Sequence, residues 1–268
     1  MKAERCQYRS QIARVVVVVA GVVGALLPYA TTAAPLPTEM VLIPAGEFIM
    51  GSDPLEGRIG FDIGVDSIPK RRITLKAFYL DKYEVTIGAY RVFVNAMHGE
   101  APAIWSDFSM FGYPAPQDNH PVVDVNWHAA DSYCRWAEKR LPTEAEWEKA
   151  ARGPDGRPWP WGGQFEPDYA TTESRGRGFT TAVGSMPKDV SPYGIYDMAG
   201  NAMEWTASLY ESYPGALKRV IVDQRFRILR GGAWDLLGTP FTRASNREYR
   251  LADLAQPDFG FRCAKDAS

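Results

Sequence analysis

Two acidic residues, Asp197 and Glu204, stand among apolar neighbours in the stretch YDMAGNAMEW. Carboxylates seldom occur in such surroundings unless a positive group compensates their charge. The stretch therefore predicts a charged site in the interior of the protein. Its chemistry depends on which cation, a side chain or a metal ion, faces these two carboxylates.

The N-terminus predicts export. Residues 15–27 form a short apolar run, which follows four basic residues and precedes the small-residue segment PYATTAAP. These are the three parts of a secretory signal peptide, and the run is shorter than a transmembrane helix needs. We therefore expect a signal peptide over residues 1–33, cleaved near Ala33 or Ala34, rather than an uncleaved anchor. The mature protein should be periplasmic or secreted.

Export changes what the cysteines and the charge imply. Cys134 and Cys263 are the cysteines that remain in the mature chain, and an even pair in an oxidising compartment favours a disulfide over two buried thiols. The mature chain holds 26 basic and 31 acidic residues, a net charge of −5. Because the sequence has no basic patch, we expect no nucleic-acid partner. We also expect no membrane association once the signal peptide is removed.

Short elements must position these residues. The segment 40–52 predicts two strands that turn at Pro44, and the segment 71–86 predicts further strand. Thr86 can then cap a helix over residues 87–97, which has apolar residues at helical spacing.

Two further helices are predicted in the middle of the chain. Segment 126–140 places one apolar face on a helix, formed by Trp127, Ala130, Tyr133, Cys134 and Ala137. Thr143 and Glu146 form a capping-box pattern at the start of the next helix. From 153 to 200, Pro, Gly, Trp and Tyr interrupt regular structure, and strand-like pieces return at RILRGGAW and FGFRCA. We expect one α+β domain over residues 40–266.

Several long stretches follow one another in a fixed order: MVLIPAGEFIMGS, FYLDKYEVT, HPVVDVNWHAADSYCRWAEKRLPTEAEWEKAAR, SPYGIYDMAGNAMEWT, RILRGGAW and FGFRCA. In this order they resemble the formylglycine-generating enzyme superfamily, also called the sulfatase-modifying-factor family. The resemblance implies a C-type-lectin-like fold with small sheets, two helices and a high fraction of irregular structure. It also implies a disulfide between the positions of Cys134 and Cys263.

The resemblance implies a structural calcium ion at the YDMAGNAMEW loop. By position, its ligands would be the side chains of Asp197 and Glu204 and the carbonyls of Gly200 and Ala202. A hard cation takes several carboxylate and carbonyl oxygens, and glycine permits the sharp backbone that aims carbonyls inward. The alternative is that Glu204 and Asn201 hydrogen-bond loop backbone without a metal.

A second calcium site of the family lies upstream, in YATTESRGRGF. The positions that would supply an Asn and an Asp side chain hold Thr171 and Arg177 here. A cation at a ligand position repels calcium. We therefore expect a single calcium site.

The copper chemistry of formylglycine-generating enzymes needs two cysteines after the Arg-Gly-Gly strand, because soft thiolates bind copper(I). Those positions fall near Leu236 and Phe241 here, and no cysteine occurs between residues 135 and 262. We expect no copper and no copper–thiolate oxidase mechanism. The ergothioneine-type sulfoxide synthases instead bind iron through histidines, but we interpret His98, His120 and His128 as packed or surface imidazoles.

The loop after the Arg-Gly-Gly strand remains the candidate for a functional cleft. Arginines among Asn, Glu and aromatic residues suit planar anionic or phenolic groups. The alternative is that the arginines form ion pairs that hold the loop, while Trp234 packs beneath it. The candidate residues are Trp234, Asp235, Arg243, Asn246, Arg247, Glu248 and Arg250.

Export, the family motifs and the missing thiolates together resemble the exported bacterial branch without the cysteine pair, which includes the pyoverdine-maturation type. This predicts maturation or oxidative modification of a partner, which would be a peptide, a siderophore-like molecule or a protein. The main alternative is a non-catalytic ligand-binding or accessory module on the same fold. A formylglycine-generating oxidase acting on sulfatases is a third possibility.

Overall fold

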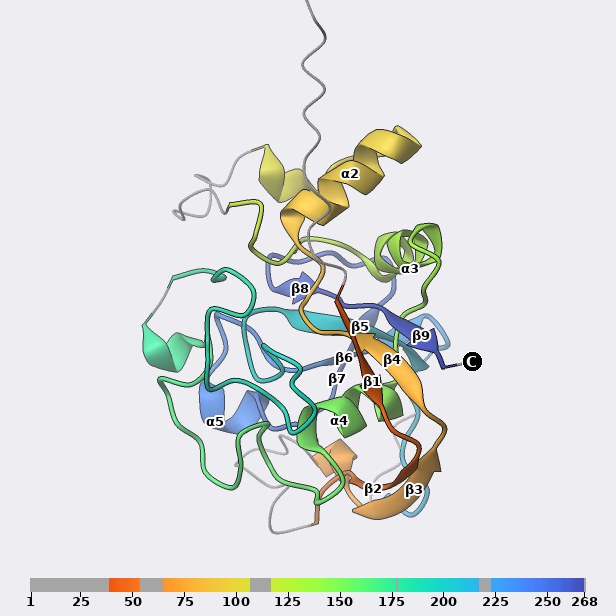
Figure 1. Ribbon diagram of the computed structural model, residues 1–268, viewed down its shortest axis with the longest axis vertical. Coiled ribbons are helices and arrows are strands. Elements are labelled where there is room, and N and C mark those ends of the chain that lie inside the picture. The colour runs from red at the N-terminus through yellow and green to blue at the C-terminus, as the bar shows by residue number, and fades with distance from the viewer. Residues whose placement is uncertain (1–38, 54–64, 107–116, 177, 217–222, 268) are drawn as a thin grey trace, which may run out of the picture. The chain divides into compact units, whose positions relative to one another are not determined.

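The computed structural model describes residues 39–53, 65–106, 117–176, 178–216 and 223–267 (Figure 1). The predicted signal peptide and Arg177 lie outside these ranges. Within them, no helix combines the length and the apolar character that crossing a bilayer requires.

Two small sheets are formed by the N-terminal half and the C-terminal strand. Strand β4 (Phe78–Asp81) pairs antiparallel with β1 (Met40–Ile43) on one side and with β9 (Ala264–Asp266) on the other. Strand β2 (Gly46–Met50) pairs antiparallel with β3 (Arg71–Leu75). The predicted strands of segments 40–52 and 71–86 are therefore confirmed.

The third sheet has the order β7-β6-β5-β8 and contains Glu204. Its strands are β5 (Met203–Leu209), β6 (Phe226–Arg230), β7 (Glu248–Leu251) and β8 (Phe259–Gly260). Strand β8 runs parallel to β5, whereas the other pairs are antiparallel. Glu204 lies opposite Arg230 on β6 and Gly260 on β8. Because a strand pairs with it on each side, Glu204 stands in the interior of the sheet and not at its edge.

The three predicted helices are confirmed, and local capping explains where they begin. Thr86 Oγ1 accepts from the Ala89 N–H, and Asn126 Oδ1 accepts from the Ala129 N–H. Thr143 forms the predicted capping box with Glu146. The helices are α2 (Ile87–Met97), α3 (Trp127–Trp136), α4 (Glu144–Arg152) and the short α5 (Gly238–Phe241). Single 3₁₀ turns occur at Val65–Ser67, Ala103–Trp105 and Glu173–Arg175.

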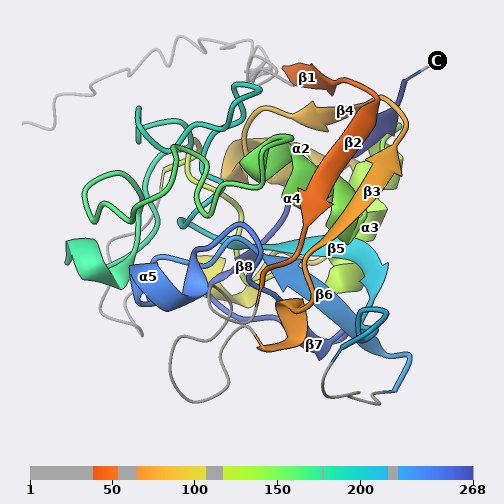
Figure 2. The same cartoon turned by 90° about the horizontal axis from the view of Figure 1, so that it is seen from below.

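Helix α4 packs against strands of all three sheets (Figures 1 and 2). Its Trp147 and Ala150 pack in one apolar cluster with Ile43 of β1 and Leu80 of β4. The helix also contacts β2, β5 and β6. Because it is surrounded, its polar residues Glu144 and Glu148 are buried as well, and they need partners inside the protein.

The predicted disulfide between Cys134 and Cys263 is present, with a Cα–Cα distance of 5.6 Å. It joins helix α3 to the segment between β8 and β9. Both cysteines are fully buried in the cluster that α2 and α3 form with β5 and β8, where Tyr133 stacks on Tyr90. The crosslink therefore closes the part of the core that α3 covers.

Candidate functional site

The positive partner of Glu204 is Arg262. Arg262 Nε and Nη2 each donate to one carboxylate oxygen of Glu204 at 2.7 Å, and Trp147 Nε1 donates to Oε2 at 2.8 Å. All three side chains are fully buried. Both oxygens of Glu204 are thus occupied by donors from the chain itself.

Arg262 also binds backbone carbonyls of two segments. Its Nη1 donates to the carbonyls of Asp81 and Lys82 at 3.3 Å, and its Nη2 donates to that of Tyr196 at 2.9 Å. One guanidinium therefore fixes the end of β4 against the YDMAGNAMEW loop. Of the two residues in the metal-free alternative, Asn201 does bind loop backbone, since its Oδ1 accepts from the Thr181 N–H at 2.9 Å, whereas Glu204 is bound by side chains.

Three further carboxyl groups are buried nearby, and they outnumber the cations. Glu84 accepts from Asn201 Nδ2 at 2.6 Å and from the Ala202 N–H at 3.0 Å. Asp197 Oδ2 accepts from the Gly184 N–H at 2.6 Å. Burial raises the pKa of Asp197 to about 7 and raises the pKa values of Glu84 and Asp189 as well.

A calcium ion fits these residues in part. Glu204 offers no unengaged oxygen, but Asp197 Oδ1 and Asp189 Oδ1 are buried without a hydrogen-bond partner in the part of the chain that the structure describes. Carboxylate oxygens of this kind are the ligands that calcium binds. No three carboxylate, imidazole or thiolate side chains converge to hold a metal within the described ranges. An ion here would therefore rely on backbone carbonyls, such as those predicted at Gly200 and Ala202.

Of the two residues discussed for the upstream calcium site, Thr171 lies within the described ranges and Arg177 does not. Thr171 is buried, and its hydroxyl shares a hydrogen bond with that of Thr181 at 2.7 Å. Its backbone carbonyl accepts from the Asn201 N–H at 2.8 Å and lies 2.4 Å from where a Cβ on Gly200 would stand. Glycine at position 200 is thus required by this close approach.

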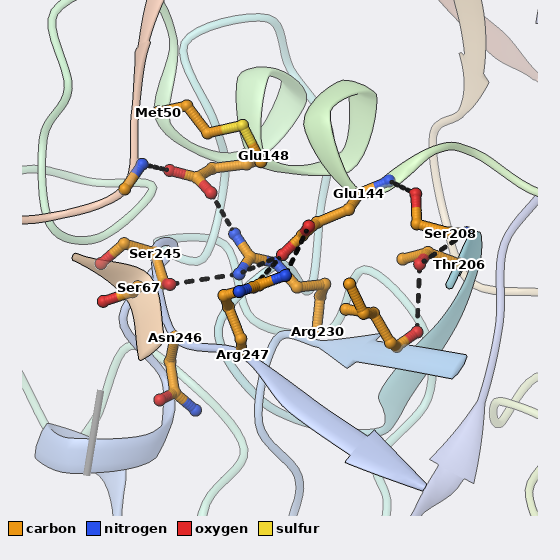
Figure 3. Close-up of polar contacts among 12 residues, drawn as sticks. Met50, Ser67, Glu144, Glu148, Thr206, Ser208, Arg230, Ser245, Asn246 and Arg247 are labelled. Atoms are coloured by element: carbon orange, nitrogen blue, oxygen red, sulfur yellow. Dashed lines mark hydrogen bonds and ion pairs between the residues drawn. The ribbon is translucent and has the colours of Figure 1, made fainter. Parts of the chain in front are cut away.

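The structure separates the residues of the predicted cleft: Asn246 and Arg247 are buried (Figure 3), whereas Arg243 is half-buried. Arg247 Nε donates to Glu144 Oε1 at 2.5 Å, and Nη2 donates to Oε2 at 3.1 Å. Asn246 Nδ2 donates to the Phe241 carbonyl at 3.1 Å. The Arg243 guanidinium lies 4.8 Å from the ring centroid of Trp159. For Arg247 the ion-pair alternative therefore applies.

The remaining predicted residues gather around one carboxyl group that the sequence analysis missed, Asp258. Trp234 is buried against Phe179 and donates from Nε1 to the Pro257 carbonyl at 3.2 Å. Arg250 Nη1 pairs with Glu248 Oε2 at 2.6 Å.

Burial, together with the nearby charges of Asp235 and Glu248, raises the pKa of Asp258 to about 7, although Arg250 acts to lower it. The pKa of Asp235 is raised too, by partial burial of its carboxyl and by Glu173. A carboxyl group with a pKa near neutrality can accept or donate a proton at physiological pH. Asp235 and Asp258 are 23 positions apart in irregular segments, so no spacing pattern could have connected them.

The histidines occupy separate structural positions. His120 Nδ1 lies 3.1 Å from Thr180 Oγ1, and burial lowers its pKa. His128 is exposed and pairs with Asp253. His98 ends α2 in the left-handed conformation. The three side chains therefore form no common centre.

Comparison with known proteins places this fold in a known class. Residues 28–267 match the family model of the sulfatase-modifying factor enzyme 1-like domain, and the chain belongs to this formylglycine-generating enzyme family. The family predicted from the sequence motifs is thus confirmed, together with its mixed α+β fold.

Two curated relatives illustrate the similarity. The chain is 32% identical over 280 residues to the inactive C-alpha-formylglycine-generating enzyme 2 of Mus musculus, covering 85% of this chain and 86% of that protein. It is 31% identical over 290 residues to the formylglycine-generating enzyme of Bos taurus, covering 86% and 75%.

Solved structures agree with this assignment. PvdO from Pseudomonas aeruginosa has a TM-score of 0.66 at 27% identity, covering 85% of this chain and 94% of that chain. Treponema denticola variable protein 1 has a TM-score of 0.67 at 22% identity, covering 85% and 95%, and it shows the shared fold alone.

Proposed function

We propose that this chain is an exported member of the family that matures or modifies a peptide, a siderophore-like molecule or a partner protein without copper–thiolate chemistry. The observation that supports this is the grouping of Asp258 with Asp235 and Trp234, the last two of which lie in the loop where the relatives are expected to hold thiolates. Two carboxyl groups cannot replace thiolates as copper(I) ligands, but they suit proton transfer.

In this proposal Asp258 acts as the general base. Its position directly before β8 is fixed, because the Met203 N–H donates to its backbone carbonyl at 2.8 Å. The neighbouring Arg250 provides a positive group that would attract an anionic or phenolic substrate. Removal of a proton from a phenolic or amide group of the substrate would then be the step that this chain contributes.

Replacement of Asp258 should abolish turnover. We expect Asp258→Asn to lower the rate by roughly 10²–10⁴-fold, since the amide cannot accept the proton. The wild-type rate should rise with pH through about 7, where Asp258 loses its proton. The measurement is oxygen consumption and product mass with phenolic peptides, with and without added copper or iron. Asp253→Asn, which changes an exposed carboxylate paired with His128, is the matched control.

The same assay distinguishes the second candidate, a non-catalytic binding module. This candidate is favoured by the 32% identity to a protein whose name describes it as inactive. Tight binding of a peptide without turnover would support the module and contradict the general-base role. Turnover that Asp258→Asn leaves unchanged would contradict that role as well.

We also propose that a structural calcium ion binds at Asp197. We expect EDTA to lower the melting temperature and added Ca²⁺ to restore it, because an ion that binds only the folded state stabilises it. Asp197→Asn should remove this response, since it takes away the carboxylate with the unpartnered oxygen. A wild-type melting temperature that changes neither with EDTA nor with added Ca²⁺ would exclude the ion.

A further inference from the structure

A separate cleft of about 230 Å³ lies where the N-terminus of α4 meets the ends of β2, β3 and β5. Its lining includes Arg71, Glu144, Ser208, Tyr213 and Arg247. Figure 3 shows Glu144 between Ser208 and Arg247, which it contacts through its backbone N–H and its carboxylate, respectively. Asp235 and Asp258 do not line this cleft, so it is distinct from the site of the proposed function.

The two glutamates behind this cleft are each paired with buried guanidinium groups. Glu144 is shared by Arg247 and Arg230, and Glu148 is shared by Arg230 and Arg152. These carboxylates are therefore already engaged by three guanidinium groups. Asp66 is tied to the same network, because its carboxyl accepts from the Tyr210 hydroxyl at 3.0 Å and its backbone carbonyl accepts from Arg247 Nη1 at 3.0 Å.

Arg71 supplies a fourth guanidinium that has no carboxylate partner among the described residues. It lies 3.8 Å from the ring centroid of Tyr213, and Arg247 lies 4.0 Å from the same centroid. Its Nη2 donates to Met50 Sδ at 3.4 Å. Its Nε and Nη1 are buried without a hydrogen-bond acceptor in the described parts of the chain. Unpaired charged donors of this kind are costly unless a ligand accepts from them.

We propose that this cleft binds a small oxyanion, either a carboxylate or a tetrahedral phosphate or sulfate group, through Arg71. Guanidinium donors bind such oxygens strongly. Ser208 offers a second donor, since its Oγ accepts from the Glu144 N–H at 3.0 Å and its O–H has no acceptor among the residues that the structure describes. Glu144 does not repel the anion strongly, because Arg247 and Tyr213 already bind its oxygens. The exposed Glu211 is the other carboxylate of the lining.

The test is calorimetric titration of the purified full chain with inorganic phosphate, sulfate and acetate at constant ionic strength. We expect saturable binding of at least one anion, and the comparison of acetate with the two tetrahedral ions identifies the preferred geometry. Arg71→Gln should weaken that binding by about tenfold or more. Arg72→Gln is the matched control, because the next residue of β3 pairs with exposed Glu47 at 2.7 Å and should leave the affinity unchanged.

Three outcomes would overturn the proposal. They are no saturable binding of any anion up to about 10 mM, equal weakening in the Arg71 and Arg72 variants, and wild-type affinity in Arg71→Gln. A general salt effect acts on all variants alike, so the Arg72 control detects it. Should Arg71→Gln fail to fold, Arg71→Lys and Ser208→Ala replace it. Each should bind more weakly than wild type, and wild-type affinity in both would overturn the proposal.

Discussion

Glu204→Gln should lower the free energy of unfolding by about 3–5 kcal/mol, because it leaves the fully buried Arg262 without its hydrogen-bonded counter-ion. One effect opposes this loss of stability. Glu204 repels the neighbouring carboxyl groups and so raises the pKa values of Glu84 and Asp197, and the substitution relieves that repulsion. The two hydrogen bonds at 2.7 Å outweigh this relief. Urea unfolding followed by circular dichroism measures the change.

Glu47→Gln is the control for this variant. Glu47 pairs with Arg72 at the same distance of 2.7 Å, but both side chains are more than half exposed. Exposed pairs contribute about 0–1 kcal/mol, so this variant should unfold nearly as the wild type does. A loss of similar size in both variants would show that burial does not determine the strength of the Glu204–Arg262 pair.

The second large effect concerns the disulfide. Replacing both Cys134 and Cys263 by alanine should lower the free energy of unfolding by about 5 kcal/mol in the chain-entropy model, because the bond closes a loop of 129 residues. Alanine is preferred to serine, since both positions are fully buried and a hydroxyl there would add a desolvation cost. Thermal unfolding of the variant and of the reduced wild type should give the same midpoint.

Two results would contradict this account. A reduced wild type as stable as the oxidised protein would show that the crosslink does not constrain the unfolded chain. Titration of the denatured, unreduced mature protein should find no free thiol, and detection of two thiols would show that the bond does not form.

Local signals in the sequence were sufficient for the helices. Thr86 and Thr143 specify the starts of α2 and α4 through contacts three residues away, which a sequence pattern can represent. Strand β5 was not predicted, although Met203–Leu209 alternates apolar residues with Glu204, Thr206 and Ser208, which is the period of a strand. These polar residues are tolerated in β5 because Arg262, the Ile228 carbonyl and the Glu144 N–H meet them.

The candidate sites depended on distant contacts, and prediction was correspondingly weaker. The sequence indicated that Glu204 needs a positive partner, but not that Arg262 supplies it from 58 residues away. Arg247 was assigned to a cleft near Trp234, yet its carboxylate partner Glu144 is 103 residues earlier in the chain. Asp258 follows no motif. Such pairings arise from the packing of α4 between the sheets, which no local pattern contains.

The position of Arg262 directly before Cys263 has a consequence for how the protein matures. Oxidation ties Cys263 to α3, and this holds the adjacent guanidinium close to the carbonyls of Lys82 and Tyr196 that it must bind. We therefore expect the irregular segments to reach their final arrangement late, after Cys134 and Cys263 have formed their bond. A chain retained among cytoplasmic reductants would keep its helices but lack the anchor for those segments.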